Sequence, residues 1–177
     1  LTNLLEYQGK RLAITICEDV WNLCDQRYPS DPLEEIVDLE PDLLINLSAS
    51  PWHLNKEEQR KDLLGKVVEK VKCPVTYINA VGGNDELIFD GHSMSIDQSG
   101  DVISVSSSFR ESIEIHDLKE SPISTKNEVG EMESLRQALV LGIRDYAGKS
   151  GFSKGLVGLS GGIDSAVTAA LAVEALG

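Results

Sequence analysis

The hydrophobic positions in the first half of the chain fall into short runs that predict strands alternating with helices. The runs RLAITIC and DLLINLS are apolar and partly β-branched, which suits buried strands. From Asn55 onward, hydrophobic residues recur every three or four positions, which predicts an amphipathic helix with Asn55 as its N-cap. The predicted elements are strands at 11–17, 42–48 and 74–79 and helices at 33–39 and 55–71.

The second half begins with a different pattern. Gly82 and Gly83 interrupt the third strand, and we expect the stretch NDELIFDG that follows to be a loop. Short alternating segments then predict antiparallel strands. The predicted elements of this half are strands at 92–97, 102–106 and 111–116, a helix at 131–149, a short strand at 154–158 and a terminal helix after Ser165. The helix at 131–149 is expected to present Met132, Leu135, Leu139, Ile143 and Tyr146 on one face.

A polar stretch without periodicity divides the chain. Residues 117–130 contain one proline and are predicted to be an interdomain linker. The expected organisation is therefore one α/β domain over 1–116, this linker, and the start of a second α/β domain over 131–177. Because the chain begins with Leu rather than Met, we expect it to be part of a longer protein.

The net charge of -13 argues against a nucleic-acid partner, since such a protein needs a basic surface. No apolar run approaches the roughly 20 residues that cross a bilayer, so no membrane association is expected. The three cysteines, Cys17, Cys24 and Cys73, form no CxxC pair. Reduced thiols and a cytoplasmic location are the prediction, with Cys24 and Cys73 as structural residues.

The segment GLSGGIDS at 158–165 has the composition of an anion-binding loop. Its two adjacent glycines permit close backbone approach to a ligand, and Ser160 and Ser165 offer hydroxyl donors. The helix that follows directs its N-terminal N–H groups toward the same place. No lysine follows the glycines, so this is not a Walker A loop. The alternative is a plain strand-to-helix turn capped by Asp164 or Ser165.

Cys17 stands where a predicted strand ends. A nucleophile needs this exposure, together with nearby backbone N–H groups that can bind an oxyanion. The alternative is a buried core cysteine, the commonest environment of this residue.

The sequence around Cys17 resembles the nitrilase superfamily, and its glutaminase domains in particular. The residues that carry this resemblance are ICEDVW, with the C-E-D-x-W pattern, and NLSASP some thirty residues later. The resemblance implies that Cys17 is the nucleophile and that the backbone N–H of Glu18 helps to form the oxyanion hole. It also implies that Trp21, Ser50 and Lys56 bind glutamine, although Lys56 could instead be a solvated helix residue. The Glu and Lys that complete the family's triad lie upstream of this sequence.

The segment SGGIDS resembles the pyrophosphate loop of the N-type ATP pyrophosphatases. The resemblance implies cleavage of ATP between its α- and β-phosphates, with Asp164 helping to hold Mg²⁺. The implied ATP-binding residues are Gly158, Leu159, Ser160, Gly161, Gly162, Ile163, Asp164 and Ser165.

A thiol glutaminase followed by a pyrophosphate loop resembles the glutamine-dependent NAD synthetase family. The implied activity is that of a carbon–nitrogen ligase that adenylates deamido-NAD with ATP and amidates it with ammonia from glutamine, in a homo-oligomer. The implied fold is the second half of a nitrilase-type α-β-β-α sandwich followed by the first strand, loop and helix of a Rossmann-like domain. This stretch alone is expected to have neither activity. The alternatives are a stand-alone nitrilase-type amidase and a nucleotide-binding module with an inert Cys17.

Overall fold

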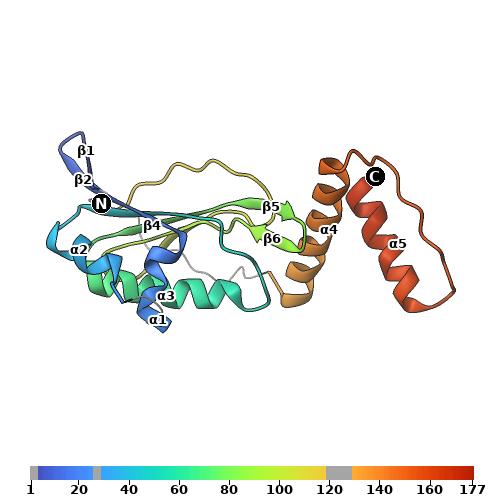
Figure 1. Cartoon of the computed structure of the whole chain (residues 1–177), viewed down its shortest axis with the longest axis horizontal. Coiled ribbons are helices and arrows are strands. Elements are labelled where there is room, and N and C mark those ends of the chain that lie inside the picture. Colours follow the sequence, from blue (N-terminus) through green and yellow to red (C-terminus); the bar gives the residue numbers. More distant parts are fainter. Residues whose placement is uncertain (1–3, 26–28, 119–128) are drawn as a thin grey trace.

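The computed structural model describes residues 4–25, 29–118 and 129–177, apart from the side chains of residues 24 and 25. Figure 1 shows a sheet with helices α2 and α3 on one side of it, and two further helices, α4 and α5, at the other end of the chain. The strands are β1 (Leu4–Tyr7), β2 (Lys10–Ile16), β3 (Leu43–Ser48), β4 (Val75–Asn79), β5 (Val81–Asn84), β6 (Leu87–Asp90), β7 (Met94–Ile96) and β8 (Val102–Val105). The helices are the 3-10 helix η1 (Cys17–Val20), α1 (Asn22–Asp25), α2 (Pro32–Asp38), α3 (Lys56–Val71), α4 (Glu131–Lys149) and α5 (Ile163–Leu176).

Three parallel strands form the centre of the six-stranded sheet, whose order is β1-β2-β3-β4-β7-β8. β2 pairs in parallel with β3, and β3 pairs in parallel with β4, whereas β1, β7 and β8 join antiparallel at the two sides. Parallel strands need crossover connections, and α2 and α3 are these crossovers. The carboxyl ends of β2, β3 and β4 consequently meet at one edge of the sheet, where ligand sites of α/β proteins are found.

The main core lies between this sheet and α3. Leu63, Leu64 and Val67 of α3 are at most 1% exposed and pack against Leu44 and Tyr77 of the sheet. The three- and four-residue spacing of these positions places them on one helix face, so the amphipathic pattern of 55–71 is confirmed as a core-facing helix. On the face of the sheet opposite α3, hydrophobic side chains such as Ile16, Leu47 and Ile78 are exposed.

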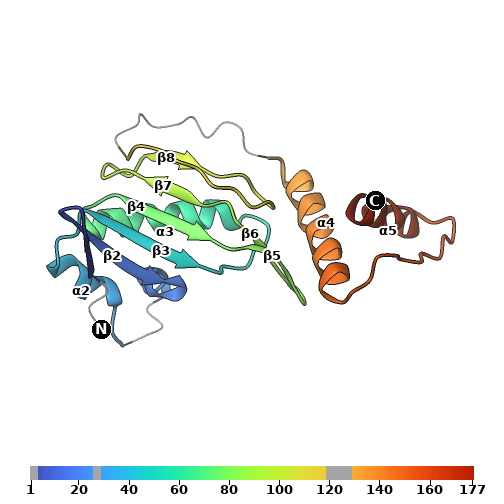
Figure 2. The same ribbon diagram turned by 90° about the horizontal axis from the view of Figure 1, so that it is seen from above.

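A second, smaller core joins the hairpin β5–β6 to α4. The hairpin forms a separate two-stranded sheet, and Figure 2 shows it extending from the large sheet toward α4. Phe109, Ala138 and Leu141 are buried there, with Trp52 packed against them. A Cβ atom added at Gly142 would lie 2.8 Å from Ile88 Cδ1. The close contact between α4 and the hairpin therefore depends on the missing side chain of this glycine.

The structure confirms most predicted elements of the first half and corrects several others. The stretch after Gly83 was expected to be a loop, but it forms β6, and β5 begins before it. β1 was not anticipated. The expected strand at 111–116 is wrong, because this segment has no paired strand within the described residues and Ile113 is 98% exposed. Asn55 occupies the predicted N-cap position of α3, but it has a left-handed φ of 66° and its side chain makes no capping hydrogen bond.

Two expectations about the C-terminal part also fail. α4 has the predicted bounds, but Met132, Leu139 and Tyr146 of its expected core face are exposed, and Ala138, Leu141 and Ala147 are buried instead. The expected strand at 154–158 is an irregular segment in which Leu156 is fully exposed, since no neighbouring strand pairs with it in the described ranges. Most of the predicted linker lies outside the described residues. Within them, no helix is both long and apolar enough to cross a membrane.

Candidate active site

Cys17 occupies a sharp turn where β2 ends and η1 begins. Its φ of +45° is left-handed, a conformation that costs an L-residue roughly 1–2 kcal/mol and has to be held by its surroundings. Within η1, the carboxylate of Asp19 stabilises this turn by accepting a hydrogen bond from the Ile16 backbone N–H at 2.7 Å. The thiol is partly exposed, in contrast to Cys73, which is 3% exposed. Burial raises the pKa of the Cys73 thiol to about 11, which suits a structural residue.

Cys17 opens into a cavity of about 490 Å³ between η1, the segment after β3, and α3. All five glutaminase residues predicted from the sequence line this cavity: Cys17, Glu18, Trp21, Ser50 and Lys56. Cys17, Glu18 and Trp21 follow β2, whereas Ser50 and Lys56 follow β3. The parallel pairing of β2 with β3 brings these two groups together across some thirty residues of sequence. The structure therefore places these predicted residues together.

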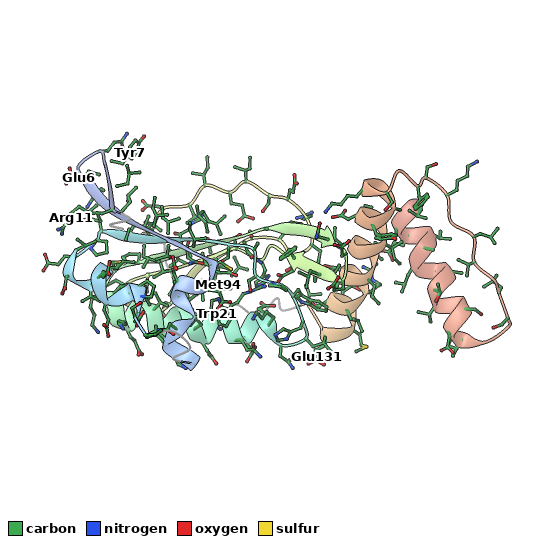
Figure 3. All side chains as sticks on the ribbon, in the orientation of Figure 1. Glu6, Tyr7, Arg11, Trp21, Met94 and Glu131 are labelled. Atoms are coloured by element: carbon green, nitrogen blue, oxygen red, sulfur yellow. The ribbon has the colours of Figure 1, made fainter. Side chains whose placement is uncertain are left out.

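Lys56 begins α3 and lies over Trp21, with its Nζ atom 4.1 Å from the centre of the indole ring. Figure 3 labels Trp21 on the side of the sheet that carries α3. Burial, and then the nearby positive charge of Arg60, lower the pKa of Lys56 below its ordinary value of 10.5. Lys56 is thus a half-buried cation facing the cavity and not a fully solvated helix residue.

Ser50 is 4% exposed and is held through its backbone. Its N–H donates to Asn79 Oδ1 at 2.8 Å, and its carbonyl oxygen accepts from Arg60 Nη2 at 2.9 Å. Asn79 ends β4, the third parallel strand, so all three central strands contribute a residue at this edge of the sheet.

The cavity continues along α3 to residues that the sequence reasoning missed. The additional lining residues are Pro51, His53, Gln59, Asp62, Leu63 and Lys66. Lys56, Gln59, Leu63 and Lys66 follow one another at spacings of three and four, which is one stripe of a helix. Given Lys56 as a site residue, this helical spacing would have predicted Gln59, Leu63 and Lys66 as further lining residues.

The predicted ATP loop is an exposed turn that leads into α5. The hydroxyl groups of Ser160 and Ser165 are 3.1 Å apart, and Ser165 Oγ also donates to the Gly162 carbonyl at 3.0 Å. Gly161 has a φ of +88°, which requires glycine, whereas Gly162 has an ordinary extended conformation. α5 begins at Ile163, so its first N–H groups adjoin this loop. Asp164 is exposed in the first turn, and no cluster of three metal-binding side chains is found in the described part of the chain.

The loop adjoins α5, at the opposite end of the molecule from α1 and α2 (Figure 1), whereas Cys17 begins η1, the element just before α1. α4 stands between them. It contacts the hairpin through Asp145, which accepts a hydrogen bond from the Gly83 N–H at 2.7 Å. It contacts α5 through an ion pair between Arg136 and Glu174. The thiol cavity and the glycine loop are therefore two separate sites.

Comparisons with known proteins find similar sequences over nearly the whole chain. The NAD synthase family model matches residues 135–177, the segment that contains α4, the loop and α5. The glutamine-dependent NAD(+) synthetase of Synechocystis sp. is 41% identical and aligns with 97% of this chain, and that of Acinetobacter baylyi is 34% identical over 98%. This chain is related to the glutamine-dependent NAD(+) synthetases. The resemblance seen in its motifs is confirmed.

Solved structures of NAD(+) synthetases confirm the expected α/β fold. The synthetase of Acinetobacter baumannii, solved in complex with adenosine diphosphate, superposes on all of this chain with a TM-score of 0.87 and 33% identity. That of Cytophaga hutchinsonii covers 98% of the chain, with a TM-score of 0.71 and 26% identity. The chain spans about a third of the length of its curated NAD(+) synthetase relatives, 32% for the first two. It spans 33% and 26% of the two solved chains.

Proposed function

We propose that this chain carries the glutaminase thiol and the ATP loop of a glutamine-hydrolysing NAD synthetase. The observation that carries the proposal is the convergence of Cys17, Ser50 and Lys56 on one cavity, from segments up to forty residues apart. The proposed organisation is a glutaminase part over 1–116, a linker over 117–130 and the beginning of the synthetase part over 131–177.

In the glutaminase reaction, the Cys17 thiolate attacks the side-chain amide carbon of glutamine. A C–S bond forms, the C–N bond breaks and ammonia leaves, after which water hydrolyses the thioester to glutamate. The oxyanion is bound by backbone N–H groups, with that of Glu18 as one donor. Ser50 and Lys56 bind the charged end of glutamine, with Trp21 as a neighbouring wall. The proton-transferring Glu and its Lys partner belong to the upstream part of the family's sequence.

In the synthetase reaction, the carboxylate of deamido-NAD attacks the α-phosphorus of ATP and pyrophosphate leaves. Ammonia then attacks the adenylated carbonyl, and AMP leaves as NAD forms. The backbone of Gly158–Ser165 and the N-terminus of α5 are proposed to bind the phosphates. A single exposed carboxylate suits Mg²⁺, which binds proteins through one or two carboxylates together with substrate phosphates, so Asp164 is the proposed protein ligand. Homo-oligomerisation and a cytoplasmic location stay predictions.

A variant of Cys17 tests the proposal in the full-length protein. Cys17→Ala should abolish NAD formation with glutamine and retain it with ammonia, because the thiol serves only to release ammonia. Cys73→Ala is the matched control, since Cys73 is a buried thiol outside the cavity, and it should retain both activities. Equal loss of both activities in Cys17→Ala would contradict the proposal.

Product analysis separates the proposal from the alternatives. The proposed reaction yields AMP and pyrophosphate in amounts equal to NAD. An amidase alone would release ammonia from glutamine without any need for ATP. A nucleotide-binding module with an inert Cys17 would leave glutamine intact.

A further inference from the structure

The segment that carries Ser50 is anchored by an ionic network outside the cavity lining. Arg60 and Asp90 form its centre: Arg60 Nη1 donates to Asp90 Oδ2 at 2.7 Å, and the two side chains are 0% and 4% exposed. None of the cavity-lining positions is Arg60, Asn79 or Asp90. The network therefore stands behind the site and does not face its ligand.

Arg60 serves two partners at once through the two ends of its guanidinium group. While Nη1 binds Asp90, Nη2 donates to the Ser50 carbonyl at 2.9 Å and approaches Ser50 Oγ at 3.5 Å. Asn79 completes the arrangement, because it accepts from the Ser50 N–H at 2.8 Å and donates to Asp90 Oδ1 at 3.3 Å. Both backbone polar groups of Ser50 are thus held by side chains of one network.

A buried ion pair is costly to form, since both charges lose their hydration, and well-packed hydrophobic residues would often be as stable. We therefore ask which group the Arg60–Asp90 ion pair orients. The planar fork of arginine can bridge a carboxylate and a carbonyl in fixed geometry, which a lysine ammonium cannot do. Here the second partner is Ser50, which lines the same cavity as Cys17.

We infer that Arg60, held by Asp90, is a positioning residue that fixes Ser50 for glutamine binding. This inference rests on the proposed function, because it assumes that glutamine binds beside Cys17. It assigns Arg60 no contact with the substrate. Its effect is exerted through the backbone of Ser50 and through the hydroxyl group that this backbone presents.

The test uses Arg60→Lys in the full-length enzyme. The lysine keeps a positive charge for Asp90 but lacks the second arm that reaches the Ser50 carbonyl. The loss of a charge-assisted hydrogen bond should raise the glutamine KM about tenfold. Ammonia-driven NAD formation should be unchanged, and kcat with saturating glutamine should fall less than KM rises. Lys70→Gln is the matched control, because it removes another α3 ion pair, that with Asp31, and should leave the glutamine KM within about twofold.

Direct binding distinguishes failure of this inference from failure of the proposed function. Glutamine is titrated calorimetrically into the Cys17→Ala enzyme, which cannot turn it over, with and without Arg60→Lys. A Kd about tenfold weaker in the double variant supports the inference. The inference is overturned, and the proposed function left intact, by either of two results. One is a Kd of the double variant within twofold of that of Cys17→Ala, and the other is an equal loss of glutamine-driven and ammonia-driven activity in Arg60→Lys. No glutamine binding to Cys17→Ala would overturn the proposed function itself. If Arg60→Lys does not fold, Asp90→Asn should raise the same Kd, and an unchanged Kd there overturns the inference.

Discussion

Lys56 should be the main electrostatic determinant of glutamine affinity. In the full-length protein, Lys56→Met keeps the length of the side chain but removes the ammonium group that faces the cavity. A hydrogen bond to a charged group is worth about 1.5–3 kcal/mol, which corresponds to a roughly tenfold to hundredfold rise in glutamine KM. Loss of the Lys56 ammonium from the face of Trp21 adds about 0.5–1 kcal/mol to the disturbance of the cavity wall.

Lys66 provides the matched control for this experiment. It carries the same charge on the same helix and lines the same cavity, but it is exposed and lies about 15 Å further along α3. Lys66→Met should change the glutamine KM by less than about threefold, since exposed charges interact weakly across water. An unchanged KM in Lys56→Met would refute the assigned contact. Equal effects of the two variants would show a general field in place of a contact.

The lowered pKa of Lys56 adds a pH test of the same assignment. Because burial and Arg60 disfavour its charged form, Lys56 loses its proton at a lower pH than an ordinary lysine, whose pKa is 10.5. The glutamine KM of the wild type should therefore begin to rise on the alkaline side below that value. In Lys56→Arg the charge persists, so the alkaline rise should disappear. The same alkaline rise in Lys56→Arg would show that another group titrates.

Two further predictions concern the ATP loop and the first turn of α3. Gly161→Ala should impair ATP use with both nitrogen donors, because its φ of +88° costs a Cβ-bearing residue about 1–2 kcal/mol, whereas Gly148→Ala in α4 should not. Equal ATP kinetics in both variants would remove the requirement for glycine. The Glu57 carboxylate accepts a hydrogen bond from His92, which lowers the pKa of Glu57 below 4.5. The stability from this pair is present above pH 4.5 and is lost as the pH falls through the lowered pKa of Glu57, so the unfolding free energies of wild type and Glu57→Gln should converge in acid. A difference that stays constant in acid would contradict this pairing.

The local pattern alone identified the elements that build the thiol site. β2, β3, β4 and α3 follow from apolar runs and a three- and four-residue period, because burial of one helix face or of a strand leaves a direct trace in sequence. The motif around Cys17 likewise named the residues that the structure brings into one cavity. The left-handed turn at Cys17 leaves no such trace, since its φ is set by the surrounding structure.

The sequence predicted several strands wrongly, because a strand forms only where a neighbouring strand pairs with it. The segments 111–116 and 154–158 have strand-like composition, yet neither has a paired strand within the described residues, and a strand is stable only as part of a ladder. The opposite error occurred at β6. Its residues were expected to form a loop, but they form a strand because the pairing with β5 satisfies their backbone groups.

The buried faces also depended on tertiary contacts. In α4, three large side chains of the expected face, Met132, Leu139 and Tyr146, are exposed, whereas Gly142 and Ala138 lie at the close contact with the hairpin. Arg60 of α3 is a charged residue, yet it is fully buried, since Asp90 and the Ser50 carbonyl bind it from other parts of the chain. Periodicity records which positions are apolar. It does not record which distant charge will neutralise a buried one, and only the folded arrangement of α3, β6 and the segment after β3 decides this.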